Sequence, residues 1–339
     1  MSPHLQRVRA VLAAACLGDA LGAATEGMSR HDIRSVFGAD VTDFVPPPDG
    51  APFAKGLTPG VLTDDATQML AMARVLIRTG GQPTPADAVA GMISWADDHD
   101  VFERFAGPTT RLAIEALRSG ASNVASPDVY SCSFGASNGA AMRAPAAGVA
   151  FAGNTDRAIE VAALLAAPTH NTQVAFAGAA AVAAAIAAGL DGAGNMPDTA
   201  LAAARAGEAM PSPRHVGGAR VSTRLELALE IAEKAAGDPA GTMIALEAAV
   251  GNGVAMAESV PTAIALAHGL REPMTVIRTA VNGGNDSDTI AMIAGAVAAA
   301  YAAADWVPED MVGVIEQVNC IDLEAVSAAL AGCAAERPA

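Results

Sequence analysis

The chain alternates between short polar or glycine-containing turns and longer runs of Ala, Leu, Val, Ile and Met. Apolar runs of that kind, opened by Thr, Asp or Pro, are typical of helices with a capped first turn. Alternating β-branched segments of useful length do not occur in the sequence, so we predict an all-α fold. The expected helices are residues 7–21, 65–78, 84–96, 109–118, 155–165, 172–188, 224–236, 242–252, 262–270, 273–281, 289–303 and 323–330.

Two proline- and glycine-rich segments, residues 45–60 and 195–218, are predicted to be loops. The first leaves too little chain before it for a separate domain. The second lies between two acidic clusters that can meet only inside one folded unit. A single domain over residues 1–339 is therefore expected, although the length alone suggests about two.

Two apolar stretches resemble membrane-directed segments. Residues 171–190 form an uncharged run close to spanning length, but Ala and Gly dominate it and make insertion into lipid unfavourable. Residues 1–15 carry Arg7 and Arg9 before an apolar stretch, without a convincing cleavage site. We predict that both are helices of a soluble protein.

Composition narrows the functional classes. The chain is 52% hydrophobic but only 4% aromatic, and Ala dominates its apolar residues. Such small side chains favour closely packed helices. A net charge of −16 argues against a nucleic-acid backbone or an anionic membrane as partner, because both require a basic patch. The four cysteines show no metal-binding spacing and are too few for a disulfide scaffold, which favours the cytoplasm: Cys16, Cys132, Cys320 and Cys333.

The most informative motifs are two short acidic clusters that each open an apolar run. Two like carboxylates about 4 Å apart repel by about 4 kcal/mol at an effective dielectric of about 20, so a shared site would require cations or protons. All the donors are hard oxygens, which favours Mg²⁺, Mn²⁺ or Ca²⁺ over zinc, and two ions would balance four carboxylates. The clusters are Thr63, Asp64 and Asp65, and Asp286, Ser287, Asp288 and Thr289. An alternative is that each cluster merely caps its own helix.

Three further motifs carry candidate chemistry. Glu26 follows a helix that ends in two glycines, and is a candidate acid or base; alternatively it is a solvated loop residue. The turn at Ser137, Asn138 and Gly139 could offer free N–H groups to an anion such as a diphosphate, although such turns are common. His170 opens the Ala-rich helix, where a structural role is the simpler interpretation.

Taken together and in this order, these blocks resemble the ADP-ribosylglycohydrolases, the family that includes the dinitrogenase reductase-activating glycohydrolase and the ADP-ribosylarginine and ADP-ribosylserine hydrolases. The resemblance covers about residues 8–304. It rests on Gly18-Asp19-Ala20-Leu21-Gly22 with Glu26, Thr63-Asp64-Asp65-Ala66-Thr67-Gln68, Ser137-Asn138-Gly139-Ala140-Ala141-Met142-Arg143, Thr169-His170, Glu258-Ser259-Val260-Pro261, and Asp286-Ser287-Asp288-Thr289-Ile290-Ala291 with Ala294-Gly295.

The resemblance implies an all-helical fold, a single-domain orthogonal helical bundle, with a binuclear Mg²⁺ or Mn²⁺ centre. It implies that Glu26 lies by the scissile anomeric bond, that Asp65 and Asp288 assist proton transfer, and that His170 contacts the distal ribose side. The substrate-binding residues would be Asp64, Ser137, Asn138, Gly139 and His170, and the metal ligands Thr63, Asp64, Asp65, Asp286, Asp288 and Thr289.

One position departs from the family pattern. Asn285 stands between Gly283-Gly284 and the second acidic cluster, so the backbone at that wall is expected to differ. Phe105 and Phe134 are the candidate stacking partners for an adenine.

Three functions remain open on the sequence. The first is hydrolysis of the glycosidic bond of an ADP-ribosyl group, on a protein or a small molecule. The second is hydrolysis of a nucleoside or another small riboside at the same metal site. The third is a catalytically silent, crystallin-like binding or structural protein, which the retention of every acidic ligand argues against.

Overall fold

The computed structural model describes residues 1–120, 134–192, 194–235 and 237–333. Within these residues it contains seventeen α-helices, two short 3₁₀ segments and two isolated β-bridges, but no strand, so the all-α prediction is confirmed. Cys132 and the predicted helix end at residue 236 lie outside the described residues.

The helices are α1 (Pro3–Gly22), α2 (Arg30–Phe37), α3 (Asp64–Arg78), α4 (Pro85–Ala96), α5 (His99–Phe105), α6 (Pro108–Arg118), α7 (Ala144–Ala150), α8 (Thr155–Ala166), α9 (Gln173–Asp191), α10 (Met196–Ala209), α11 (Val221–Lys234), α12 (Pro239–Ala249), α13 (Met256–Leu270), α14 (Pro273–Val281), α15 (Ser287–Tyr301), α16 (Glu309–Asn319) and α17 (Leu323–Gly332), with 3₁₀ segments η1 (Asn138–Ala140) and η2 (Ala304–Trp306).

All twelve predicted helices are present, most of them with ends displaced by a few residues, and two predictions are wrong by more than that. Residues 195–218 were expected to be a loop, but α10 occupies most of that segment, because Pro197 lies in the first turn, where a missing N–H costs little. The helix predicted to begin at residue 262 begins at Met256, and Pro261 lies inside it. Residues 45–60 contain no helix, as predicted.

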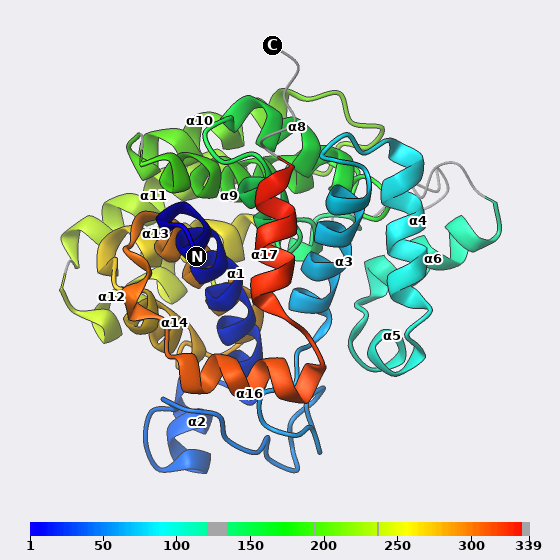
Figure 1. The fold of residues 1–339 in the computed structure, drawn as a ribbon. Helices are drawn as coiled ribbons and strands as arrows, with labels where there is room; N and C mark the ends of the chain where they lie inside the picture. Colours follow the sequence, from blue (N-terminus) through cyan, green and yellow to red (C-terminus); the bar gives the residue numbers. More distant parts are fainter. Residues whose placement is uncertain (121–133, 193, 236, 334–339) are drawn as a thin grey trace.

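The Ala-rich helix α9 lies at the centre of the molecule and packs against α7, α8, α10 and α15. Figure 1 shows α8 to α10 along the top of the molecule, above α1, and α4 to α6 as a group at its right. By length and composition α9 is the one helix of the described residues that could cross a membrane, yet it is almost entirely buried among its neighbours. It serves here as a core helix.

Helices α1 and α15 pack with their backbones in direct contact at two glycines of α1. A Cβ atom added at Gly18 would lie 2.4 Å from the backbone of Ala291, and one added at Gly22 would lie 2.3 Å from the Cα of Asp288. No real Cβ atom fits at that distance, so the two glycines allow the backbones to touch. This contact places the end of α1 beside the beginning of α15.

We expect Gly18→Ala to destabilise the protein by about 1–3 kcal/mol, because the added methyl group must push two helix backbones apart. Gly313→Ala is the matched control: Gly313 lies inside helix α16 with open space around its Cα, so helix propensity makes that change neutral or stabilising by up to about 1 kcal/mol. Urea unfolding of both variants measures the difference. Equal stability of the two would show that the α1–α15 contact is looser than described.

Candidate functional site

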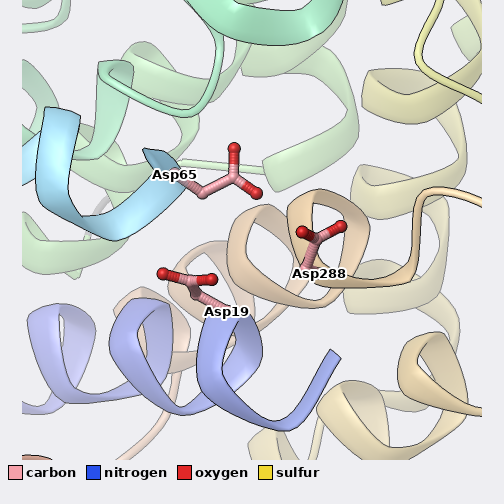
Figure 2. Close-up of side chains that lie close together, drawn as sticks. All are labelled: Asp19, Asp65 and Asp288. Carbon is pink, nitrogen blue, oxygen red and sulfur yellow. The ribbon is translucent and has the colours of Figure 1, made fainter. Parts of the chain in front are cut away.

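Three carboxylates from distant parts of the chain meet where α1, α3 and α15 converge. Asp19, Asp65 and Asp288 each offer an oxygen atom within 4.8 Å of the others, and all three are buried. Figure 2 shows the side chains pointing toward one another from the end of α1 and the first turns of α3 and α15. Thr289 connects the two predicted clusters directly, because its hydroxyl donates to Asp65 Oδ2 at 2.8 Å.

Asp19 is the residue of this group that sequence reasoning did not single out. Its carboxylate accepts from the Thr63 hydroxyl at 2.6 Å, the Thr63 amide at 3.0 Å and the Ala66 amide at 3.1 Å. These donors are free groups at the N-terminus of α3, so Asp19 ties that helix to α1. With its oxygen atoms engaged in this way, Asp19 acts as an anchor for Asp65. The signal available was its place in the Gly18-Asp19 motif.

A second group consists of Glu26, Asp286 and Asp288, whose oxygen atoms also lie within 4.8 Å of one another. The turn that carries Glu26 is fixed by Thr25, whose buried hydroxyl bonds to Val281 O at 2.8 Å and to Ser287 Oγ at 2.9 Å. Asp288 belongs to both groups and is therefore the common member of one continuous carboxylate cluster.

The wall next to Glu26 is made by two segments paired through their backbones. Gly27 N donates to Asn285 O, and Asn285 N donates to Met28 O, both at 2.7 Å. Asn285 takes a left-handed conformation with φ of 57°, which Asn tolerates better than most residues. The residue that departs from the family pattern thus closes this backbone pairing.

The alternative that the clusters only cap their own helices accounts for part of the arrangement. Thr63 does cap α3, because its hydroxyl accepts from Asp65 N at 3.3 Å. Asp286 stands at the N-cap of α15 but makes no side-chain cap bond; it accepts from the Asn138 side chain instead. The carboxylates themselves are directed into a shared site.

Burial and mutual repulsion raise the pKa of every carboxyl group in the cluster. Burial, and then the charge of Asp288, raises the pKa of Glu26 to about 11. Burial likewise raises the pKa of Asp19 to about 7, of Asp286 to about 8 and of Asp288 to about 6. Asp64 and Asp65 have pKa values well above the usual range for the same causes. The cluster therefore holds protons at neutral pH unless a cation replaces them.

The donor set fits a hard divalent cation. Asp288 Oδ1 is buried and makes no hydrogen bond within the described residues, although it is surrounded by other carboxylates. A buried oxygen atom without a partner is costly unless something absent from the protein binds it. The surrounding atoms are carboxylate and hydroxyl oxygens, the ligands that Mg²⁺, Mn²⁺ and Ca²⁺ prefer. The cluster can therefore hold metal.

The predicted anion-binding turn forms the opposite wall. Ser137 Oγ lies 2.8 Å from His170 Nε2, and a Cβ atom at Gly139 would meet the His170 ring at 2.7 Å. The backbone N–H of Asn138, which was expected to be free, donates to Val254 O at 3.0 Å. The side-chain amide of Asn138 donates to Asp286. Asn138 thus joins this wall to the acidic cluster, and its role toward a phosphate stays a prediction.

A cavity of about 590 Å³ brings the predicted residues together. Ten of the eleven line it, Thr63 being the exception: Glu26, Asp64, Asp65, Ser137, Asn138, Gly139, His170, Asp286, Asp288 and Thr289.

The rest of the cavity lining includes aromatic and cationic groups. Phe53, Arg104 and Phe105 line it, and Arg104 lies 5.6 Å from the centre of the Phe105 ring. Phe134, the other candidate stacking partner, is not among the residues that line this cavity. It lies beside Arg214, whose guanidinium carbon is 5.1 Å from the centre of the Phe134 ring. A separate cavity of about 710 Å³, along α9, α10 and α11, contains none of the predicted site residues.

Residues 1–338 match the ADP-ribosylglycohydrolase family. The chain belongs to this family. The uncharacterized protein YegU of Escherichia coli K12 is 30% identical over 98% of this chain and 99% of its own length. The human ADP-ribosylhydrolase ARH3 is 28% identical over 90% of this chain and 88% of its own.

The fold is also found among solved structures. A structure of an ADP-ribosylglycohydrolase-related protein complex superposes with a TM-score of 0.70, covering 98% of this chain and 100% of that one at 23% identity. The likeness shows a shared fold. The family to which the chain belongs is a family of glycohydrolases, that is, of hydrolases.

The raised pKa values predict how stability depends on pH. Without divalent cations, the folded protein binds more protons at these carboxyls than the unfolded chain does. Their contribution is therefore full below about pH 4 and is lost as the pH rises through the folded-state pKa values, about 6 for Asp288, about 7 for Asp19 and about 8 for Asp286, while Glu26, at about 11, loses its share last. Because Mg²⁺ replaces protons at the cluster, its stabilising effect grows over the same range.

Thermal unfolding in chelator and in excess Mg²⁺, at about pH 6 and about pH 8, measures this coupling. We expect a larger Mg²⁺-induced rise in Tm at the higher pH. A rise of the same size at both values, or none at either, would contradict the assignment of the cluster as a cation site.

Proposed function

We propose that the protein is a Mg²⁺- or Mn²⁺-dependent hydrolase that cleaves the glycosidic bond of an ADP-ribosyl group. The observation that carries the proposal is the carboxylate cluster centred on Asp288, which lines the 590 Å³ cavity. The cluster offers hard oxygen donors and a buried, unpartnered Asp288 Oδ1. The family and the human ADP-ribosylhydrolase relative support the choice of an ADP-ribosyl substrate.

The remainder of the cavity suits the rest of such a substrate. Arg104 supplies a positive charge and Phe105 an aromatic face, which an adenosine diphosphate could engage by charge and by stacking. Ser137 offers a hydroxyl on the wall between that region and the carboxylates. The net charge of −16 would by itself repel a diphosphate, but a local cation such as Arg104 can attract one into the cavity.

Two cations would be held around Asp288, by Asp65 and Asp286 from the two carboxylate groups that share it, by Asp64, and by the hydroxyls of Thr63 and Thr289. When bound, they would offset the carboxylate charges and act as Lewis acids toward the hydroxyl oxygens of a ribose.

The chain's own residues would orient the sugar and move the proton. Glu26 stands at the mouth of the cluster on a turn held rigidly by Thr25, so its carboxyl can give up or receive a proton at the anomeric centre. Asp65 is fixed by Thr289 and, through Thr63 and Asp19, by α1. The buried walls exclude bulk water, which strengthens the interaction of these charges with a developing oxocarbenium centre.

We expect Asp288→Asn to lower turnover at least about 100-fold, because it removes the carboxylate common to both groups. The same change removes one like charge from the cluster, so the metal-free variant should be as stable as the wild type or slightly more stable. Release of ADP-ribose and thermal unfolding in chelator are the two measurements.

Asp198→Asn is the matched control, since Asp198 also lies in the first turn of a helix but is exposed to solvent. It should leave both quantities unchanged. The substrates should include ADP-ribosyl-arginine, ADP-ribosyl-serine and plain nucleosides, with and without chelator. An undiminished rate for Asp288→Asn would refute the proposed mechanism. Release of free ribose from nucleosides, without action on any ADP-ribosyl compound, would favour the small-riboside alternative.

A further inference from the structure

Arg143 is a buried cation behind the site, with only 1% of its surface exposed. It lies just before α7, and its guanidinium donates to three neutral oxygen atoms: Gln68 Oε1 at 2.8 Å, Thr169 Oγ1 at 2.7 Å and Leu165 O at 3.4 Å. A guanidinium has no acceptor and keeps its proton in proteins, so each of these oxygens must accept. One immovable donor thus fixes the orientation of the groups around it.

The first consequence reaches the acidic cluster through Gln68. Because its Oε1 accepts from Arg143, its amide nitrogen must face the other way. The structure shows that nitrogen donating to Asp64 Oδ2 at 2.9 Å. Gln68 is fully buried, so the amide cannot turn over without leaving two polar groups unpaired. Asp64 is therefore held by a donor whose direction Arg143 determines.

The second consequence reaches the opposite wall through Thr169 and His170. The Thr169 hydroxyl accepts from Arg143 and lies 2.7 Å from His170 Nδ1. If Nδ1 carried the ring proton, Thr169 would accept twice and its own hydrogen would be buried without an acceptor, which is costly. Thr169 therefore donates to Nδ1. Burial and the charge of Arg143 hold the pKa of His170 well below its usual range, so the ring is neutral and its single proton is on Nε2.

The chain of donors ends at Ser137. With its proton on Nε2, His170 donates to Ser137 Oγ at 2.8 Å, and the ring is held flat against Gly139, where a Cβ atom would clash. Ser137 Oγ has then accepted from the protein, and its own hydrogen is left for the cavity that Ser137 lines.

We propose that Arg143 is a positioning residue that sets the direction of every hydrogen bond from Asp64 to Ser137, so that Ser137 presents a proton to an acceptor atom of the ligand. The partner must be an acceptor atom, and, resting on the function proposed above, we assign it as a phosphate oxygen of the ADP-ribosyl group. A group that can only donate, such as an ammonium, is rejected at that point.

The tautomer of His170 tests the direction of the chain without any substrate. Two-bond ¹H–¹⁵N correlation of the ¹⁵N-histidine-labelled protein at neutral pH, with His170→Gln to identify the resonance among six histidines, reports which nitrogen is protonated. We expect an unprotonated Nδ1 and a protonated Nε2. A proton on Nδ1, or a doubly protonated ring, overturns the inference.

Binding of ADP-ribose in the presence of Mg²⁺ tests the consequence. Ser137→Ala and Thr169→Val should each weaken the affinity by about 10- to 100-fold, because both remove the same hydrogen bond to a charged acceptor. The double variant should be no weaker than Ser137→Ala alone. Thr169→Ser keeps the hydroxyl and should bind like the wild type, which controls for effects on folding. Multiplication of the two losses in the double variant would overturn the inference.

The two proposals fail in different ways. If the wild type does not bind ADP-ribose but His170 shows the expected tautomer, the proposed substrate is wrong and the direction set by Arg143 stands. If ADP-ribose binds and is hydrolysed while His170 carries its proton on Nδ1, the function stands and the role of Arg143 is wrong.

Discussion

The site depends on one constraint: like charges are confined where water cannot screen them. Six acidic side chains gather where α1, α3 and α15 converge, and burial raises the pKa of each. Such a cluster is stable only while protons or cations occupy it. The fold therefore has to supply a rigid frame that keeps the carboxylates together.

The frame is built from contacts that are ordinary one by one. Glycines at positions 18 and 22 let α15 touch α1, Asp19 ties the first turn of α3 to the same helix, and Thr289 bonds to Asp65. Each contact involves only a few atoms, but together these contacts join segments that lie more than two hundred residues apart in the sequence. The repulsion within the cluster is offset by packing in a core that lies almost wholly outside it.

Much of this could be predicted from the sequence, for physical reasons. Long apolar runs with capped ends specify helices by themselves, and α14 lies exactly where the pattern places it. The motif residues could be assigned to one site because they follow one another in the order found in the family, and ten of them do line one cavity. Short helices such as α5 and α7 could not be predicted, since they are held by neighbours more than by their own propensity. Nor could the pattern reveal that the backbone N–H of Asn138 donates to the carbonyl oxygen of Val254, because that hydrogen bond joins distant segments of the chain.

The two sides of the cavity rest on different parts of the fold. Glu26 and Asp286 flank the paired backbones of residues 27–28 and 285, so these two carboxyl groups and the beginning of α15 form one rigid unit. Arg104 and Phe105 lie instead on α5, which packs on α3 and α4, and Arg104 bonds to the backbone of the loop at Phe53. Changes in α5 and that loop can reshape one side of the cavity without disturbing the carboxylate cluster. The architecture thus separates the part of the cavity that can vary from the part that the helix packing holds in place.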